Sequence, residues 1–559
     1  MKVQQISQQQ SISSKNKQPS FGSAIDLTMR YLATNQAVGA NSVDLASMVA
    51  PRTINDSVRR GPLAGIETFR REIMGTVNDS LLGGYGMAAG ALIAALMGIQ
   101  GKFGVSANKI LAAPETVNIL AENKTHQIKG NESQYEYLRN IFKDIKVFNP
   151  SSENADIEGF VKLSDETVDK VSKTMDKVIS DTTIDYSKWN SKKSADSIHV
   201  VKNMIIGEVG GESKVILTSL DGKHTSETKL ATLLEDTFNL SKAFNKKNVM
   251  KAFEEQINSN KSIFENRFIK NFAKFGKVKS LAGFAIASAV GLSVQPINMY
   301  LTKKKTGTDG FVGVEGRTKD NSKTFLGLKL ASTAGFLGMV MSTLNPEING
   351  LKKVLPHNFM KKMAFKGFWP TVNQLKGVYG ITIISRLMSS RDKDELRESL
   401  TKDFCGYLSW LVLGDIVNRL VAEKLNNSVM NRTKAVENKG FWSRAFNSTL
   451  KTRDEILVET LAKNGISTNK EVDGKTIAKT FKEMMQDLNG IKNEAVKKAA
   501  KKRLSTLNKA QFAGYAFSCI VLGLGIPNLN IYITNKLDKK HKAEINKQKE
   551  NSQDNLKTA

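Results

Sequence analysis

Two long apolar stretches that contain no charged residue set the strongest limit on how this chain can fold. The first, Ala282–Thr302, reads AGFAIASAVGLSVQPINMYLT, and the second, Ala513–Thr534, reads AGYAFSCIVLGLGIPNLNIYIT. Both begin Ala-Gly-aromatic-Ala, carry a proline thirteen residues after that glycine, and end Asn-x-Tyr-x-Thr. About 20 apolar residues cross a bilayer as a helix, so each stretch predicts a membrane span. Their likeness indicates either a duplication or convergent composition.

Other apolar stretches add to the predicted spans. Leu81–Gly101 contains no charge, Thr324–Leu344 contains only Lys329, and Phe404–Ala422 is apolar apart from three residues. The mean hydropathy of the chain is only −0.29, so spans must alternate with large soluble segments. We therefore predict a mainly α fold: a helical integral membrane protein with roughly four to six apolar spans. A large, mostly helical soluble segment with a small β-hairpin and disordered termini complete this prediction.

These patterns divide the chain into segments. They are a disordered tail (1–23), short amphipathic helices (24–79), a span (80–101), a soluble mainly helical domain (106–279), two spans with a basic loop at 303–323 (280–344), an interfacial or re-entrant part with a charged helix (345–403), a polar-faced membrane or buried helix (404–422), a soluble helical segment (424–509), a span (510–535) and a basic disordered tail (536–559).

Local patterns predict elements between the spans. Ser164–Asp181 has apolar residues at heptad-like spacing behind a serine N-cap, which predicts a helix. His199–Ile206 and Lys214–Ser219 are β-rich and joined by Gly-Glu-Val-Gly-Gly, which predicts a hairpin. Val378–Ser385 is too short to span alone, so we expect it to be re-entrant or buried. The charged run Arg391–Glu398 predicts a solvated helix with ion pairs four residues apart, or else a docking helix for a partner.

The charge balance bears on partners and orientation. Lys and Arg number 82 against 54 Asp and Glu, giving a net charge of +28, and they crowd the ends of the apolar stretches. This placement favours anionic lipid head groups over nucleic acid, for which no zinc-finger, RNP-type or helix-turn-helix signature is present. The Lys/Arg bias of loop 303–323 and tail 536–559 predicts a multi-pass protein of the cell membrane with both termini cytoplasmic and 106–279 and 424–509 outside.

Small residues recur every fourth position within the first span. Such spacing lets a second helix approach closely in lipid, so it predicts a helix-packing face and possible self-association. The residues are Gly86, Gly90, Ala94 and Gly98. In the two matched stretches, Pro296 and Pro527 are predicted to break their helices.

A charged pair lies within Phe404–Ala422. Asp415 and Arg419 are four residues apart, so their side chains are neighbours on a helix, and Asn418 lies on the same side. The functional hypothesis is an ion pair buried in the membrane that lines a path or locks two spans together. The alternative is a surface ion pair on an amphipathic helix.

Residue patterns of known catalysts are missing from the sequence. It contains no HExxH, CxxC or GxSxG motif, two cysteines, and five scattered histidines. We therefore expect no metal, no cofactor and, most simply, no enzyme. Three hypotheses remain: a structural or partner- and lipid-interacting membrane protein, a transporter or channel built on the duplicated proline-containing span, and a soluble helical protein with unusually buried helices.

Several short motifs carry a resemblance. They are Ala50-Pro-Arg-Thr53, Arg60-Gly-Pro62, Glu67-Thr-Phe-Arg-Arg-Glu72, Arg391-Asp-Lys-Asp-Glu-Leu-Arg397 and Asp403-Phe-Cys-Gly-Tyr407. These scattered motifs, about a fifth of the chain, resemble stretches in a group of uncharacterised bacterial multi-span membrane proteins with no assigned activity. The resemblance implies a bacterial membrane protein and transfers no functional residue.

Overall fold

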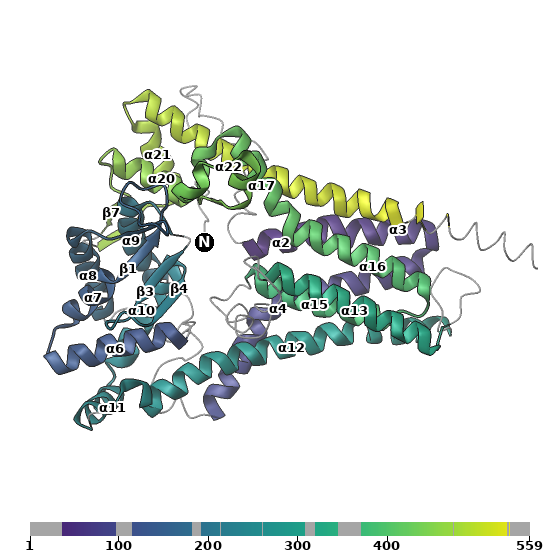
Figure 1. Ribbon diagram of the computed structural model, residues 1–559, viewed down its shortest axis with the longest axis horizontal. Helices are drawn as coiled ribbons and strands as arrows, with labels where there is room; N and C mark the ends of the chain where they lie inside the picture. Colours follow the sequence, from purple (N-terminus) through teal and green to yellow (C-terminus); the bar gives the residue numbers. More distant parts are fainter. Residues whose placement is uncertain are drawn as a thin grey trace, which may run out of the picture.

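Long helices dominate the computed structural model and gather into a bundle, with a domain of helices and short strands, the mixed domain, at one end (Figure 1). The structure describes residues 36–96, 114–181, 192–212, 214–259, 261–307, 319–344, 371–472, 475–530, 532–533 and 536. The predicted tail 1–23 and nearly all of 536–559 lie outside these residues.

Among the described residues, five helices of the bundle are long and apolar enough to cross a membrane, within the range predicted from sequence. They are Pro62–Leu96 (α4), Ile269–Thr306 in α12 (Arg267–Thr306), Lys323–Leu344 (α13), Lys393–Leu425 and Glu494–Asn530. Large apolar side chains such as Leu92, Leu330 and Leu524 point outward from them. Such an outer surface is unfavourable in water and suits lipid. The mainly helical prediction is confirmed.

Three helices of the bundle contain one π-helical turn each. Helix 36–60 joins α2 (Gln36–Asp44), η1 (Leu45–Val49) and α3 (Ala50–Arg60); helix 393–425 joins α16 (Lys393–Leu408), η5 (Ser409–Leu413) and α17 (Gly414–Leu425); and α22 (Glu494–Ile520) continues into η7 (Val521–Gly525). The η1 and η5 turns both pack against η7. Pro51 lies close to Gly523, so two of these widened turns touch.

The prolines of the matched stretches do not break their helices, so that prediction is wrong. Pro296 lies inside α12, which continues to Thr306. Pro527 follows η7 by two residues, and the chain stays helical to Asn530. A proline ring clashes with the carbonyl four residues earlier, and at Pro527 the wider π turn leaves room for the ring. Pro51 stands in the same position after η1. Pro296 has no such turn before it in α12.

A shorter helix, α15 (Val372–Met388), lies inside the bundle. It begins at a capping box in which Thr371 and Gln374 bond each other's backbone N–H groups, and most of its residues are buried. Val378–Ser385 is therefore the middle of a buried helix, one of the two predicted outcomes.

The first part of the mixed domain follows α4. Its elements are α6 (Pro114–Gly130), α7 (Gln134–Lys143), β1 (Ile145–Phe148), β2 (Phe160–Lys162), α8 (Asp165–Ser180), α9 (Lys192–Val209), β3 (Val215–Thr218), β4 (Thr225–Thr228), α10 (Leu230–Phe244), α11 (Lys247–Asn258) and η3 (Ile263–Glu265). The strands form one antiparallel sheet in the order β2-β1-β3-β4. Ser164 caps α8 by accepting from the Thr167 N–H, as predicted.

The predicted hairpin is placed one strand too early. His199–Ile206 is helical within α9, and the hairpin is β3–β4, which turns at Asp221-Gly222 with Gly222 at φ 72°. Residues of α9 such as Val200, Val201 and Ile205 are all buried, so the helix is covered on most sides. A short apolar β-branched run of this kind cannot be told from a buried strand by its pattern.

The second part of the mixed domain follows α17. Its elements are η6 (Asn427–Val429), β5 (Met430–Asn431), α18 (Lys434–Glu437), α19 (Phe441–Phe446), β6 (Thr449–Leu450), α20 (Arg453–Lys463), β7 (Asn469–Val472), β8 (Lys475–Ala478) and α21 (Phe481–Gly490). The two parts share one apolar core with the first turns of α12 and much of α22. Gly207 of α9 lies against Val458 and Ala462 of α20. The two soluble segments predicted separately are therefore one domain.

Candidate functional site

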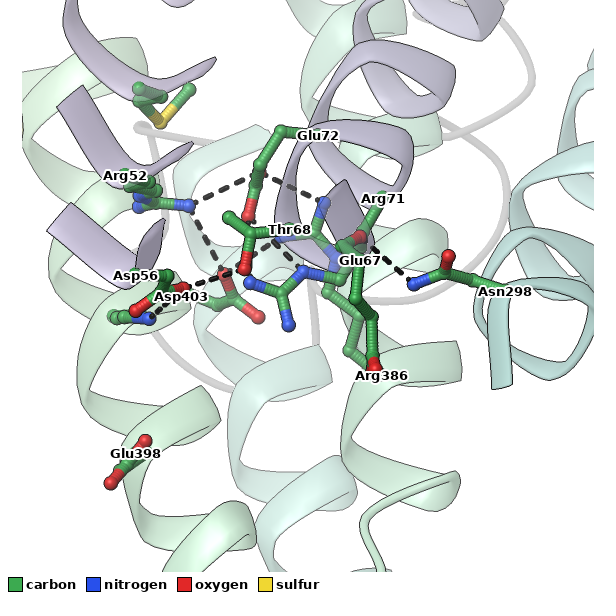
Figure 2. Close-up of polar contacts among 12 residues, drawn as sticks. Arg52, Asp56, Glu67, Thr68, Arg71, Glu72, Asn298, Arg386, Glu398 and Asp403 are labelled. Carbon is green, nitrogen blue, oxygen red and sulfur yellow. Dashed lines mark hydrogen bonds and ion pairs between the residues drawn. The ribbon is translucent and has the colours of Figure 1, made fainter. Parts of the chain in front are cut away.

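Twelve charged side chains meet inside the helical bundle, where α3, α4, α15 and α16 face one another. Figure 2 shows part of this set, including Arg52, Glu72, Arg386 and Asp403, together with Thr68 and Asn298. None of the twelve charged side chains is more than 17% exposed. The cations are Arg52, Arg60, Arg71, Arg386, Arg391 and Lys402, and the carboxylates are Asp56, Glu67, Glu72, Glu395, Glu398 and Asp403. We call this set the charge network. Its six positive and six negative groups balance.

Four residues form the centre of the charge network. Arg52 Nη1 lies 3.2 Å from Glu72 Oε2 and 3.8 Å from Asp403 Oδ1. Arg386 Nη2 lies 3.1 Å from Glu72 Oε2, and its Nη1 lies 3.0 Å from Asp403 Oδ1. Each arginine thus bridges both carboxylates. Such pairs are short and strong, but their desolvation requires that every charge keep its partner.

Two reciprocal ion pairs flank this quartet. Arg60 Nη2 lies 2.9 Å from Glu398 Oε2, and Arg391 Nη2 lies 3.1 Å from Glu67 Oε1. The backbone carbonyls of the same two glutamates each accept a hydrogen bond from an asparagine side chain. Asn298 Nδ2 of α12 donates to the Glu67 carbonyl (3.1 Å), and Asn530 Nδ2 donates to the Glu398 carbonyl (3.3 Å).

The reciprocal contacts follow a repeat in the sequence. Glu67-Thr-Phe-Arg-Arg-Glu72-x-x-Gly75 aligns with Glu398-Ser-Leu-Thr-Lys-Asp403-x-x-Gly406, with similar residues at every named position except Arg70 and Thr401, and Arg60 and Arg391 each precede the glutamate of their own segment by seven residues. Asn298 and Asn530 are the asparagines of the two Asn-x-Tyr-x-Thr endings. The two sets are therefore equivalent, which favours a duplication over convergent composition.

We call α2–α3, α4 and α12 the first repeat, and α15, α16–α17 and α22 the second repeat. A Cβ on Gly75 would lie 3.6 Å from Arg386 Nη2, and one on Gly406 would lie 3.2 Å from Arg52 Nη2. Each glycine thus faces the arginine of the other repeat. The charge network is the interface between the repeats, related by an approximate two-fold axis.

The depth of the quartet follows from the pairing of α4 with α12. Asn78 Nδ2 donates to the Ala287 carbonyl at 2.9 Å, while Asn298 reaches Glu67, so the two helices are antiparallel. Lys279 and Lys303 bound the uncharged stretch of α12, about 35 Å apart at 1.5 Å per residue. Glu72 lies level with a point roughly midway between these lysines. Charged groups at such a depth mark functional positions in membrane proteins.

A line of acids continues from the quartet towards the mixed domain. Glu72, Thr76 and Asp79 lie on one face of α4, because they are four and three residues apart. The Thr76 hydroxyl donates to the Asp44 carboxylate of α2. Asp79 is 1% exposed, and neither of its carboxyl oxygens has a hydrogen-bond partner. Buried polar atoms are rarely left in this state.

A small pocket lies against the charge network, on the side away from the line of acids. It is lined by Arg71, Glu395, Glu398, Ser399, Lys402 and Asp403. The pocket therefore touches the quartet at Asp403. Within the described residues, no group of three or more His, Cys, Asp or Glu side chains is arranged to hold a metal ion.

The structure corrects the prediction of a solvated helix at Arg391–Glu398. The Arg391–Glu395 ion pair is confirmed, with Nε and Oε2 3.0 Å apart, but both side chains are buried. Glu398 pairs with Arg60, and Lys402 lies 3.9 Å from Asp56. The charged face of α16 meets the first repeat instead of water.

The sequence-predicted ion pair forms, but at the end of a candidate span. Arg419 Nη2 lies 3.2 Å from Asp415 Oδ2, and the Asp415 side chain is 62% exposed. Arg419 also donates to the Phe446 carbonyl of the mixed domain (2.7 Å). Asn418 lies beside Gly514 of α22. This geometry matches the surface-pair alternative more closely than a pair lining a path.

The predicted small-residue face of α4 is buried at Gly86, Gly90 and Ala94. Gly98 lies outside the described residues.

Comparisons with known proteins add no assignment. No protein-family model matches the chain, and neither the curated proteins nor the solved structures include a significant match. The fold and the site together define a mainly helical protein with five helices able to cross a membrane and a balanced charge network between two repeats. Its function is inferred below from its own residues.

Proposed function

We propose that this protein is a multi-pass membrane transporter in which two repeats move relative to one another at the charge network. The observation that carries the proposal is the quartet of Arg52, Glu72, Arg386 and Asp403, buried between the repeats near the middle of the candidate spans. Ionisable residues at this depth are costly and usually serve ion pathways. Transporters built from repeats commonly bind their substrate at the repeat interface near the midplane.

The shared geometry of the quartet supports movement. Because both arginines contact both carboxylates, the arginines can exchange partners without leaving any charge unpaired. Two pairings of similar free energy are what a two-state rearrangement requires. The pocket at Asp403 gives the quartet access from the end away from the mixed domain.

Reconstitution into liposomes tests the proposal. The purified protein should move an ion or small solute across the vesicle membrane, and Glu72→Gln should reduce the rate at least tenfold because it removes one of the shared carboxylates. Asp415→Asn makes the same chemical change at an exposed position and should keep the wild-type rate. Absence of flux for every ion and solute tried would refute the transporter proposal.

A structural or partner-interacting membrane protein is the second candidate. Its support is the mixed domain, whose single core draws on both repeats and presents a large soluble surface at one end of the bundle (Figure 1). The basic ends of the spans would bind anionic head groups. Silent liposomes together with specific capture of a partner through the mixed domain would favour this candidate.

The bundle also bears on orientation in the cell membrane. Helix 36–60 is antiparallel to α4, since Asn41 bonds Ser80 and Asp56 bonds Thr68. Helix α2, which begins at Gln36, therefore lies at the end near the mixed domain (Figure 1). Asn530 lies at the opposite end, because it donates to the carbonyl of Glu398, whose side chain pairs with Arg60 at the end of α3. If the bundle spans a membrane, residues 36 and 530 lie on opposite sides of it, and we propose this topology beside the expectation that both termini are cytoplasmic. Reporter fusions at residues 36 and 536 giving the same side would exclude this topology.

A further inference from the structure

We propose that the transported or coupling species is a proton, carried by Asp79 opposite Asp44. This inference rests on the proposed transporter function and names its substrate. Asp79 is 99% buried without a hydrogen-bond donor for either carboxyl oxygen, whereas the Asp44 carboxylate accepts the Thr76 hydroxyl. A carboxylate anion in this position would be a buried charge without compensation. The neutral acid is the form that the surroundings of Asp79 accommodate.

The groups around Asp79 leave it without a counter-ion. Asp44 faces it from α2, and Tyr85 lies further along its own helix. Arg386 is the nearest cation of α15, but its two Nη atoms are held by Glu72 and Asp403. Two neighbouring buried carboxyl groups do not readily both ionise, so one proton is retained by the pair.

The position of Asp79 links the pair to the charge network. It lies seven residues beyond Glu72 on the same face of α4, a rise of about 10 Å. Thr76 stands between them, with its hydroxyl on Asp44. A proton taken up at Glu72 reaches the pair through Thr76, whose hydroxyl gives its own proton to Asp44 and takes one in return. The pair then holds one proton more than at rest, and Asp79 releases that proton towards the mixed domain before the next one arrives.

This route couples proton movement to the repeats. When Glu72 or Asp403 takes up the proton, its carboxylate loses its charge and its hold on Arg52 and Arg386 weakens. The arginines then favour the other carboxylate, which shifts the balance between the two pairings. Release of the proton to Asp44 or Asp79 restores the quartet. No redox step or further co-reactant is required.

A proton fits this pair better than a metal cation. A bound calcium ion takes six to eight oxygen ligands and a magnesium ion six, whereas the pair offers two carboxyl groups and one hydroxyl. A proton needs only one carboxyl oxygen to bind to.

Proteoliposomes that contain a pH-sensitive dye test the inference. Under an imposed membrane potential, wild-type protein should change the internal pH, Asp79→Asn should lower the initial rate at least tenfold, and Asp415→Asn should match wild type. Infrared spectroscopy should show the C=O stretch of a protonated buried carboxylic acid in the wild type and its loss in Asp79→Asn. Wild-type proton flux in Asp79→Asn, or an unchanged infrared band, would overturn the inference.

A second variant covers the case in which Asp79→Asn does not fold. Asp44→Asn keeps the Asp79 carboxyl but changes its neighbour, so it should slow proton flux and shift the infrared band. An unshifted band with wild-type flux would refute the pair. If the wild type moves another ion but no protons, and Glu72→Gln abolishes that flux, the transporter proposal stands and the proton inference fails. If nothing is moved, both fail.

Discussion

Replacing Glu72 by glutamine tests whether the charge network holds the two repeats together. The change keeps the size of the side chain and removes its charge, so it leaves no cavity. Glu72 Oε2 lies 3.2 Å from Arg52 Nη1 and 3.1 Å from Arg386 Nη2, and its Oε1 lies 3.1 Å from Arg71 Nη2. After the substitution, two fully buried guanidinium groups share the single carboxylate of Asp403.

The expected loss is large because the stranded charge has no access to water. Removing one partner of a buried pair costs about 3–5 kcal/mol in the free energy of unfolding. The equivalence of the two repeats predicts a similar loss for Asp403→Asn. Arg52→Met combined with Glu72→Gln restores neutrality, so the double variant should recover about 1–3 kcal/mol relative to Glu72→Gln alone. The exposed Asp415 gives the contrast, since Asp415→Asn should cost less than about 1 kcal/mol.

Unfolding in mixed micelles, followed by circular dichroism as the denaturing detergent increases, measures these differences. The size of the purified particle checks that each variant begins folded. A Glu72→Gln variant within about 1 kcal/mol of wild type, or additive effects in the Arg52–Glu72 cycle, would show that the network is hydrated and not the interface described above.

Three further predictions concern packing, pH and membrane depth. Gly514→Ala should destabilise the bundle by about 1–3 kcal/mol, because its Cβ would lie 1.9 Å from Asn418 Oδ1, whereas Gly335→Ala, with open space around it, should be neutral or stabilising in the same unfolding assay. Burial lowers the pKa of Lys124 to about 8, and its hydrogen-bond partners are neutral. Lys124→Met should therefore be more stable than wild type at pH 7, and this difference in the free energy of unfolding of the mixed domain should shrink by about 2 kcal/mol between pH 7 and 9.5. Exposed tryptophans of membrane proteins gather at the membrane–water interface, so we expect the exposed Trp442 to lie there. In a variant that keeps Trp442 as its only tryptophan, brominated lipids in the vesicles should quench the tryptophan fluorescence.

The sign of the pH effect follows from the lowered pKa of Lys124. Below pH 8 the lysine is charged in both states and the folded state bears the whole desolvation cost. Between pH 8 and 10.5 the folded state releases its proton first, so stability rises with pH. A constant difference between Lys124→Met and wild type would contradict this. Equal stability of Gly514→Ala and Gly335→Ala would contradict the close helix contact, and unquenched Trp442 would place α19 away from lipid.

The sequence allowed the bundle to be predicted better than its interior. Long uncharged stretches predict apolar helices able to cross a membrane, and Ser164 predicts the start of a helix, because both signals are local in the sequence. The buried character of Arg391–Glu398 was hidden, because charges spaced four apart look the same on a wet surface and on a face covered by a distant helix. His199–Ile206 was assigned to a strand because a helix covered on most sides shows no apolar stripe.

The charge network itself was not predicted, although the sequence showed one part of the repeat that forms it. The matched endings around Asn298 and Asn530 indicated a repeat, but the charged halves differ at five positions: Thr for Ser, Phe for Leu, Arg for Thr, Arg for Lys and Glu for Asp. Most of these exchanges keep the charge or polarity of the side chain but change the amino acid, so the two segments have low sequence identity. Their equivalence becomes clear in the structure, where Arg60 pairs with Glu398 and Arg391 pairs with Glu67. Asp79 gave no signal at all, because a single acid is characterised only by what surrounds it.

Ion pairs between the two repeats can form only after both repeats have been synthesised. Glu67 precedes its partner Arg391 by 324 residues. At about 5–20 residues per second, roughly 15 to 65 s pass between the appearance of the glutamate and that of the arginine. During that interval α4 carries acidic groups for which the nascent chain offers no cation of the second repeat. The insertion machinery or a bound chaperone must shelter the first repeat from lipid until the second one emerges, so ribosome stalling before residue 391 should expose α4 to degradation.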